Sequence, residues 1–568
     1  MSPDTTVAQV IAAALLRHGV QTIFSQSLPS AVLLAAEDLS IRQFTYRTEN
    51  AGTAMADGFA RVSGQVAVVT AQNGPAATLL VPGLAEAIKS SIPIVALVQD
   101  VNRPTTDRNA FQEFDHFGLF QSCAKWIRRV TEPDRMEDYV DMAFAIAASG
   151  RPGPAVLLLP ADLLNERVTS PGRRQARLGA FPLDRMLADP ARISAAADLI
   201  AAAKHPLLVA GGGIHLSNAA AELAALQDAA HLPVMTTVMG KGAVDERHPL
   251  SLGVGGYNLG RLSPGRHLRP LIEQSDLIFF VGTRTAQNGT DSWSLFPSSA
   301  RYIHLDIDPA EIGRNYEGLR LVGDAKLTLP ELTERLRGRC KPRPEFAQAI
   351  AAARDRNAGE IAPLLQSEAS PIRPERLMAD LQQVLTPETL VVADASYSTV
   401  WVACYLRALA PGMRFITPRG LAGLGWGLPM ALGARVARPA SPILCITGDG
   451  GFAHVWSELE TSLRMRAPIV LTVLNNGVLG YQKDAEDVKF GRHTSACYFA
   501  PVDHAQIARA CGCRGVTIAR PADYLPAVRE ALAAKETTVI DVLTDPQAYP
   551  PVSFFDERLE AVRRAAGK

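Results

Sequence analysis

The chain has 568 residues, which is too many for one hydrophobic core, so we expect three domains. Apolar residues make up 47% of the sequence and charged residues 20%, a composition that can fill several cores. Lysine plus arginine balance aspartate plus glutamate at 57 each, and no long basic run occurs. This balance argues against nucleic acid or an anionic membrane as a partner.

The sequence shows no sign of a membrane span or a secretory signal. It contains no run of about 18 apolar residues. Residues 1–20 begin with an acidic residue, Asp4, and lack a basic segment, so we interpret them as an amphipathic helix. Seven scattered cysteines without a paired framework indicate reduced thiols and a cytoplasmic protein.

The first part of the chain alternates short apolar runs with helical patterns. The expected strands are 22–25, 43–46, 66–70, 92–98 and one within 155–164, and the expected helices between them include 50–62 and 76–90. Strands that alternate with helices predict a parallel, doubly wound sheet. We place this domain at 1–182, with a linker rich in Pro, Gly and Arg at 170–190.

Two further domains with the same alternation follow. The second domain, 190–340, has expected strands at 206–210, 233–236, 277–282 and 302–305. The third domain, 370–550, begins with a helix at 374–385 and has expected strands at 389–393, 443–446, 469–474 and 537–543. The predicted fold class is therefore α/β, with three doubly wound parallel-sheet domains.

One strand-helix-strand unit of the third domain carries a candidate metal site. The strand at 443–446 ends in the turn Gly448-Asp449-Gly450-Gly451, and the strand at 469–474 ends in Asn475-Asn476. Parallel strands bring their carboxyl ends to one edge of the sheet, so Asp449 and Asn476 are expected side by side. A carboxylate and an amide oxygen beside a glycine-rich helix start suit Mg²⁺ bound to a diphosphate.

A second acidic residue, Glu49, stands where the strand at 43–46 gives way to its helix. Considered as structure alone, it is a helix-start acid that the helix dipole favours. Burial at the sheet edge would raise its pKa and allow it to keep a proton.

The two features together resemble the thiamine-diphosphate enzymes, whose cofactor motif begins with Gly-Asp-Gly and ends about thirty residues later with Asn-Asn. The resemblance implies thiamine diphosphate and Mg²⁺ as cofactors. It assigns the metal to the Asp449 and Asn476 side chains and the Val478 carbonyl, and it gives Glu49 the hydrogen bond to N1′ of the aminopyrimidine. The other cofactor-facing residues that it implies are Asn73, Gly74, Gly423, Gly448, Gly450, Gly451, Leu479 and Gly480.

Within that family, the first domain is similar to the acetohydroxyacid (acetolactate) synthases. The segment NAFQEFDHFGLFQSCAKW resembles their Ala-Phe-Gln-Glu segment followed by a lysine. By this resemblance Phe111, Gln112 and Lys125 line the substrate side of the cofactor, and Leu424 bends the cofactor. His116 departs from the synthase pattern, and it is either an acid/base group or a histidine of the core or surface.

The second domain resembles the part of these synthases that holds FAD. The segments TTVMGKGAVDERHPLSLG, VGTRT, HLDIDPAEIG and VGDAKLTL carry this resemblance, and Gly211-Gly212-Gly213 follows a strand. The residues that it implies for the flavin nucleotide are Gly212, Thr237, Met239, Arg284, Asp306 and Asp324. The stretch 282–288 differs from the synthase pattern, so bound ADP or no nucleotide is an alternative.

The resemblance implies decarboxylation of pyruvate and joining of the product to a second 2-keto acid or an aldehyde. It implies a homodimer or homotetramer with sites at the subunit interface, and a small regulatory subunit as a further partner. A 2-keto acid decarboxylase or benzaldehyde-lyase-like carboligase is the alternative, because Tyr397-Ser398 and His116 depart from the synthase pattern and no tryptophan follows Gly480 closely. A catalytically silent cofactor-binding regulatory protein is a third reading, against which the presence of Glu49, Asp449 and Asn476 together argues.

Overall fold

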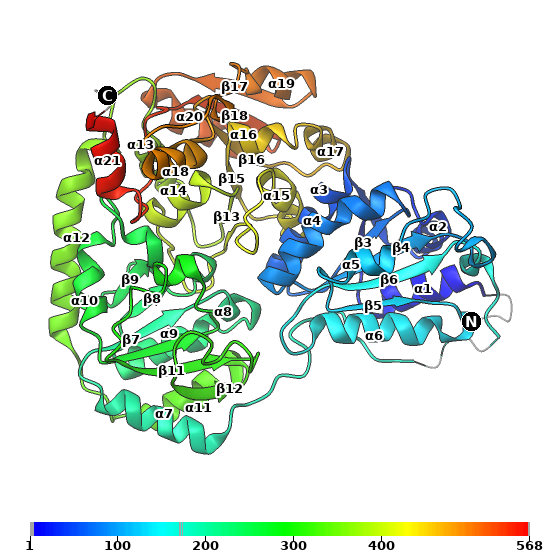
Figure 1. Ribbon diagram of the computed structural model, residues 1–568, viewed down its shortest axis with the longest axis horizontal. Coiled ribbons are helices and arrows are strands. Elements are labelled where there is room, and N and C mark those ends of the chain that lie inside the picture. Colours follow the sequence, from blue (N-terminus) through cyan, green and yellow to red (C-terminus); the bar gives the residue numbers. More distant parts are fainter. Residues whose placement is uncertain (1–4, 170–171, 173, 566–568) are drawn as a thin grey trace.

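The computed structural model describes residues 5–169, 172 and 174–565, and it contains three six-stranded sheets with helices on their faces (Figure 1). All strand pairs within these sheets are parallel. The predicted α/β class with three doubly wound parallel sheets is therefore confirmed. Part of the expected linker, residues 170, 171 and 173, lies outside the described residues, as do residues 1–4.

The first sheet has the strand order β2-β1-β3-β4-β6-β5. Its strands are β1 (Thr22–Ser25), β2 (Arg42–Thr45), β3 (Ala67–Ala71), β4 (Ile94–Asp100), β5 (Trp126–Arg129) and β6 (Ala155–Pro160). The helices of this domain are α1 (Val7–Arg17), α2 (Ser30–Asp38), α3 (Glu49–Ser63), α4 (Pro75–Ser90), α5 (His116–Phe120) and α6 (Met136–Ala148).

The second sheet, drawn in green in Figure 1, has the different order β12-β11-β10-β7-β8-β9. Its strands are β7 (Pro206–Ala210), β8 (Val234–Thr236), β9 (Ser251–Val254), β10 (Leu277–Val281), β11 (Arg301–Asp306) and β12 (Leu319–Val322). Its helices are α7 (Pro190–Ala202), α8 (Gly213–Leu216), α9 (Ala220–Ala230), α10 (Arg269–Glu273), α11 (Ala325–Leu336) and the long α12 (Pro344–Leu365).

The third sheet has the order β14-β13-β15-β16-β18-β17, which repeats the wiring of the first sheet strand for strand. Its strands are β13 (Leu390–Ala393), β14 (Phe415–Ile416), β15 (Ile443–Gly448), β16 (Val470–Asn475), β17 (Arg514–Ile518) and β18 (Thr538–Leu543). Its helices are α13 (Pro374–Gln382), α14 (Tyr397–Tyr405), α15 (Gly427–Ala437), α16 (Asp449–Ala453), α17 (Glu458–Arg464), α18 (Gly480–Phe490), α19 (His504–Ala510), α20 (Pro521–Ala534) and α21 (Asp556–Ala565).

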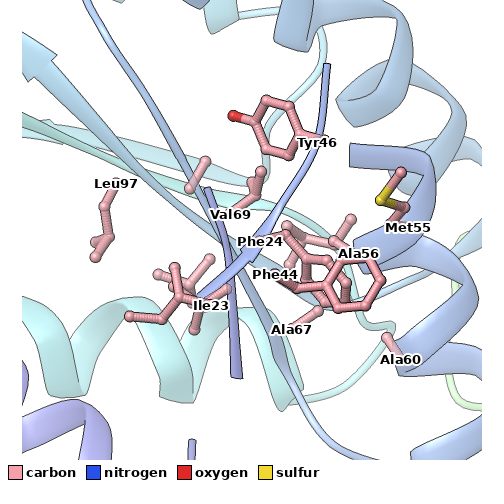
Figure 2. Close-up of a cluster of buried hydrophobic side chains, with 14 of the residues drawn as sticks. Ile23, Phe24, Phe44, Tyr46, Met55, Ala56, Ala60, Ala67, Val69 and Leu97 are labelled. Atoms are coloured by element: carbon pink, nitrogen blue, oxygen red, sulfur yellow. The ribbon is translucent and has the colours of Figure 1, made fainter. Parts of the chain in front are cut away.

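The core of the first domain packs the sheet against α3 (Figure 2). Phe24 of β1 and Phe44 of β2 have ring centroids 5.7 Å apart, and both are fully buried. Met55, from α3, is buried in the same cluster. Such burial of large side chains is the main stabilising contribution to this domain.

α3 also joins the first domain to the third, because it packs against α15 (Figure 1). A Cβ atom on Gly433 of α15 would lie 1.9 Å from the Met55 carbonyl oxygen, and one on Gly58 of α3 would lie 2.3 Å from the Met430 carbonyl. Only glycine permits so close an approach of the two backbones. The two outer domains are thus packed helix on helix.

No helix in the described ranges is both long enough and apolar enough to cross a lipid bilayer.

Candidate active site

A pocket opens where β15 and β16 end, at the carboxyl edge of the third sheet. Its lining includes Gly448, Asp449, Gly450, Gly451, Asn476, Val478, Leu479 and Gly480. β15 and β16 are neighbours in which Gly448 pairs with Leu474, so the polar residues just beyond these positions share one edge. The structure thus brings Asp449 and Asn476 into one pocket.

Asp449 is a buried carboxylate of this pocket. Its Oδ1 accepts a hydrogen bond from the Gly450 N–H at 2.9 Å, and its Oδ2 accepts one from the Gly477 N–H at 2.7 Å. Burial raises the pKa of this carboxyl to about 6, although both amide donors oppose the shift. Asn476 Oδ1 accepts a hydrogen bond from the Val478 N–H at 3.1 Å. Backbone groups therefore hold both oxygen donors in place.

The pocket offers uncharged oxygens beside the Asp449 carboxylate. Across the described part of the chain, no group of three or more His, Cys, Asp or Glu side chains could hold a metal ion. Mg²⁺ takes few protein ligands and completes its shell with water or phosphate. One carboxylate, one amide oxygen and the Val478 carbonyl fit that preference.

The start of α14 gives the same pocket a site for an anion. Ala395, Ser396, Tyr397 and Ser398 line the pocket. Ser396 precedes the helix with φ of 66°, and its side chain makes no capping hydrogen bond. The first N–H groups of a helix have no partner within the helix and favour an anion. A diphosphate bound to Mg²⁺ fits between this helix end and Asp449.

Tyr397, one of the residues that depart from the synthase pattern, contacts the start of α18 and Asp484 within it. Its hydroxyl donates to Asp484 Oδ2 at 2.6 Å, and its ring lies beside Gly480 at the start of α18. Tyr397 therefore ties the start of α14 to α18 across the pocket.

The loop that carries Gly423 and Leu424 is fixed by a carboxylate that follows β13. Asp394 accepts hydrogen bonds from the Gly425 N–H at 3.1 Å and the Trp426 N–H at 3.0 Å. Burial raises the pKa of Asp394, and these donors oppose the shift. Leu424 lines the pocket, and Gly423 adjoins the Trp426 indole.

Glu49 is the first residue of α3, one residue earlier than the sequence predicted for this helix. Thr48 caps the helix by accepting a hydrogen bond from the Ala51 N–H at 3.4 Å. Desolvation raises the pKa of the buried Glu49 carboxyl. Glu49 is not one of the described residues that line the pocket around Asp449. A single chain therefore does not bring Glu49 and Asp449 into one pocket.

The third domain nevertheless holds the start of α3. Glu458 of α17 accepts hydrogen bonds from the Arg47 N–H at 3.1 Å and the Thr48 N–H at 3.2 Å. This carboxyl is buried, and desolvation raises its pKa. The position of Glu49 therefore depends on a residue of another domain.

Two loops of the first domain meet at the carboxyl edge of its sheet. The Gln72 amide donates to Gln112 Oε1 at 2.8 Å, and the Asn73 amide donates to the Gln112 carbonyl at 3.1 Å. Asn73 and Gly74 thus lie beside Gln112. Phe111 is 86% exposed in the single chain.

His116 is a buried residue that binds the loop containing Gly74. Its Nε2 accepts a hydrogen bond from the Gly74 N–H at 2.8 Å, so the ring proton resides on Nδ1, which faces Asp100 Oδ1 at 3.3 Å. Arg129 pairs with the other oxygen of Asp100 at 2.9 Å. Of the alternatives for His116, the structure supports a core histidine, because the ring is 2% exposed.

Lys125 contacts the C-terminal end of α6. Its ammonium donates to three backbone carbonyls, Ile146 at 2.5 Å and Ser149 and Arg151 at 2.9 Å. These groups lie at the C-terminal end of α6, where a cation is favoured. Burial lowers the pKa of Lys125 to about 8. All three ammonium donors are used in the single chain, so Lys125 caps the C-terminal end of α6 there. Its place on the substrate side of the cofactor stays a prediction.

The triple glycine of the second domain has a packing explanation. A Cβ on Gly211 would lie 2.3 Å from the Gly282 carbonyl, and one on Gly213 would lie 2.6 Å from the Gly282 Cα. Gly212, between them, accepts a hydrogen bond from the Leu216 N–H. Close approach of two loops therefore accounts for Gly211 and Gly213.

The other residues expected to face a flavin fall into two groups. Thr237 caps a short turn through the Gly240 N–H, Met239 Sδ lies 3.8 Å from an Arg61 nitrogen, and Asp324 caps α11. Arg284 follows β10 and Asp306 ends β11, so both lie at the carboxyl edge of neighbouring strands. Burial lowers the pKa of Arg284 and raises that of Asp306 to about 7. Thr237 and Asp324 likewise follow the carboxyl ends of β8 and β12, so both groups lie at the same edge of the sheet.

Sequence reasoning missed three buried acids that shape the site: Glu86, Asp394 and Glu458. Each bonds to backbone N–H groups of a segment remote in sequence. Nothing in the local sequence separates them from surface acids, except that Glu86 lies in a helix otherwise rich in small apolar residues.

Three family-wide sequence profiles match the chain in order. The N-terminal TPP binding domain of thiamine pyrophosphate enzymes matches residues 5–119, the central domain matches residues 193–332, and the C-terminal TPP binding domain matches residues 394–542. The chain belongs to the thiamine pyrophosphate enzymes. The matched C-terminal domain contains the pocket of Asp449 and Asn476, and the matched N-terminal domain contains Glu49.

Individual thiamine pyrophosphate enzymes are similar to this one over nearly their whole length. The probable acetolactate synthase large subunit of Methanocaldococcus jannaschii is 32% identical over 96% of this chain and 93% of its own. The acetolactate synthase of Arthrospira platensis is 32% identical over 95% and 94% of the two chains. The acetolactate synthase large subunit of Parasynechococcus marenigrum is 34% identical over 93% and 86%.

Proposed function

We propose that this enzyme is an acetolactate synthase, which decarboxylates pyruvate and joins the two-carbon product to a second 2-keto acid or an aldehyde. The observation that carries the proposal is similarity to enzymes of that name along the whole chain. The pocket of Asp449 and Asn476 supports it, because its donors suit Mg²⁺ and its helix start suits a diphosphate.

Each residue then has a stated task. Asp449, Asn476 and the Val478 carbonyl would hold Mg²⁺, and the N–H groups at the start of α14 would hold the diphosphate. Bound thiamine diphosphate would supply the carbon nucleophile and the electron sink. Glu49 would hold a proton toward N1′ of the aminopyrimidine, because its buried carboxyl has a raised pKa.

The remaining tasks belong to uncharged residues. Leu424 would press on the cofactor from the pocket wall that it lines. The linked loops with Asn73, Gly74 and Gln112 would face the reacting substrate. Phe111 would cover the substrate and exclude water.

We infer that the working unit is a homodimer in which Glu49 of one chain faces the Asp449 pocket of the other. Apolar side chains support this, because they are exposed in the single chain on both domains concerned. They are Phe111, Phe114 and Phe117 in the first domain and Leu421, Tyr498 and Phe499 in the third. Contiguous exposed apolar surface marks interfaces. A pair of dimers and a small subunit are further assemblies, the latter supported by the large-subunit names of two relatives.

The edge formed by Arg284 and Asp306 is our proposed site for a flavin nucleotide. The carboxyl edge of a doubly wound sheet is where such ligands bind. An absorbance spectrum of the purified protein tests it, since bound FAD gives yellow bands that survive gel filtration.

A product assay tests the proposed reaction. With pyruvate, thiamine diphosphate and Mg²⁺, we expect acetolactate; acetaldehyde alone would favour the decarboxylase alternative. Glu49→Gln should lower turnover by about 100-fold or more, because general acid-base groups contribute on that scale. The exposed Glu132→Gln is the matched control and should keep full turnover. Undiminished turnover in Glu49→Gln would remove Glu49 from its task.

A further inference from the structure

Glu86 is a buried carboxylate on α4 for which the proposed mechanism has no task. It is 1% exposed, although it belongs to the first domain and its oxygens point at a loop of the third. Oε1 accepts a hydrogen bond from the Gly420 N–H at 2.6 Å. Oε2 accepts from the Leu421 N–H at 2.5 Å and from the Ala422 N–H at 3.3 Å. One side chain therefore satisfies three consecutive backbone donors.

The charge of Glu86 is compensated on its other side. Ser90, one turn later on α4, donates its hydroxyl to Glu86 Oε1 at 2.6 Å. An Arg61 nitrogen lies 3.5 Å from the same oxygen, while Arg61 also pairs with Asp57 on α3. A buried carboxylate with charged and neutral donors on all sides forms strong, directional hydrogen bonds.

The loop that Glu86 binds has the shape of an anion-binding concavity. Ala422 has φ of 63°, and successive N–H groups that converge around a left-handed residue form such a nest. Leu421 is 56% exposed, so solvent would otherwise compete for these amides. The side chains of Leu421 and Ala422 are both exposed in the single chain, so the hydrogen bonds to Glu86 are the interactions that hold this part of the loop.

The same loop is held at its far end by another carboxylate. Asp394 accepts hydrogen bonds from the N–H groups of Gly425 and Trp426. Gly423 and Leu424 are the two residues left between the two anchors. Leu424 lines the Asp449 pocket of the same chain.

We propose that Glu86 is a positioning residue that fixes the 420–422 segment and so presents Leu424 to the cofactor before the cofactor binds. The inference rests on the proposed function of Leu424 as the residue that presses on thiamine diphosphate. It makes α4 of the first domain a structural part of the cofactor pocket in the third domain of its own chain.

Hydrogen exchange of the cofactor-free protein tests the clamp directly. In Glu86→Gln the amide group keeps one acceptor oxygen but turns N–H₂ toward the Leu421 and Ala422 N–H groups. We expect the peptide covering 418–427 to exchange about 10- to 100-fold faster at these amides, the factor that loss of a charged hydrogen bond produces. Ser90→Ala is the matched control, because it removes one Glu86 partner and leaves the three backbone bonds; its exchange should match the wild type.

Cofactor binding provides the second measurement. Thiamine diphosphate with Mg²⁺, titrated by quenching of tryptophan fluorescence, should bind about tenfold more weakly to Glu86→Gln, because the loop must be ordered at the moment of binding. At saturating cofactor, turnover should return to within about threefold of the wild type. A variant with wild-type exchange and wild-type cofactor affinity would overturn the proposal.

Two outcomes keep the test decisive. If Glu86→Gln does not fold, wild-type exchange decides: protected Leu421 and Ala422 amides support the clamp, and amides that exchange as fast as an unstructured peptide overturn it. If the protein makes no acetolactate yet the exchange and cofactor results hold, the proposed reaction fails and the role of Glu86 stands.

Discussion

At the scale of single residues, Asp394, Asp449, Glu86 and Glu458 share one arrangement. Each is a buried carboxylate whose oxygens accept hydrogen bonds from backbone N–H groups of another segment. Backbone donors cannot swing away as lysine or arginine side chains can, so these acids fix loop geometry. Asp394 and Asp449 line the pocket, Glu86 binds the loop 420–422, and Glu458 binds the start of α3.

His304 provides a prediction about acid stability. Burial lowers its pKa to about 4, although its ring contacts the Thr283 carbonyl. The unfolded chain therefore binds a proton that the native protein does not, at every pH between about 6.5 and 4. The contribution of His304 to the free energy of unfolding is complete above pH 6.5, falls as the pH drops, and is lower by about 3 kcal/mol at pH 4.

His304→Gln should remove this loss. Its amide can still donate to the Thr283 carbonyl, and it does not titrate. Urea midpoints measured at intervals from pH 7 to pH 4.5 should fall less steeply in His304→Gln than in the wild type. The exposed His454→Gln should fall as steeply as the wild type. Identical slopes in all three proteins would contradict the role of burial.

The sequence predicted Asp449 and Asn476 because a local motif and one strand pairing suffice to bring them together. It did not predict the tasks of Glu86, Asp394 and Glu458, because their partners are supplied by tertiary packing. The contacts of Lys125 could not be predicted for the same reason. Its position after the Phe-Gln-Glu segment says nothing of α6, whose terminal carbonyls hold it.

At the scale of elements, the packing of α3 on α15 leads to a prediction about the stability of a Gly433 variant. A Cβ at Gly433 would lie 1.9 Å from the Met55 carbonyl, and a backbone atom cannot rotate away as a side chain can. Gly433→Ala should therefore lower the free energy of unfolding by about 1–3 kcal/mol, the usual cost of overpacking. Thermal unfolding followed by circular dichroism measures the effect.

Gly359→Ala is the matched control for this experiment. Gly359 lies in the interior of α12, and a Cβ there would meet no atom within 4 Å. The same substitution should therefore leave stability unchanged or raise it by up to about 1 kcal/mol, through helix propensity. Equal effects at both positions would argue against backbone contact between α3 and α15.

The sequence predicted the central strands better than the edge strands. The expected strand at 206–210 coincides with β7, and those at 22–25 and 389–393 match β1 and β13 to within one residue. Of the edge strands of the three described sheets, only β2 was expected, at 43–46. β5, β12 and β17 are partly exposed and lack the apolar run that marks a strand buried on both faces, and β9 and β14 are only four and two residues long.

At the scale of the whole molecule, the placing of Glu49 and Asp449 predicts complementation between chains. Glu49→Gln and Asp449→Ala should each abolish turnover. Unfolding and refolding the two variants together should produce hybrid dimers in which one site has both native residues and the other has neither. Random pairing then restores about a quarter of the wild-type turnover.

Mixing the same variants without unfolding is the control, because stable dimers exchange slowly and should stay inactive. A refolded mixture that remains inactive, while refolded wild type recovers, would mean that both residues serve a site within one chain. Light scattering of each preparation establishes the oligomeric state in which the comparison is made.

The first and third sheets have the same strand order, and each of the two domains contributes a glutamate that binds backbone N–H groups of the other. Glu86 of the first domain binds residues 420–422, and Glu458 of the third binds residues 47–48. Each domain thus supplies acceptors for backbone N–H groups of the other domain. A chimera that combines one of these domains with the other domain of a distant relative would keep both sheets but would lose the matching hydrogen bonds between the domains. A functional chimera would therefore have to transfer each glutamate together with the backbone segment that it binds, so that the interface between the domains stays intact.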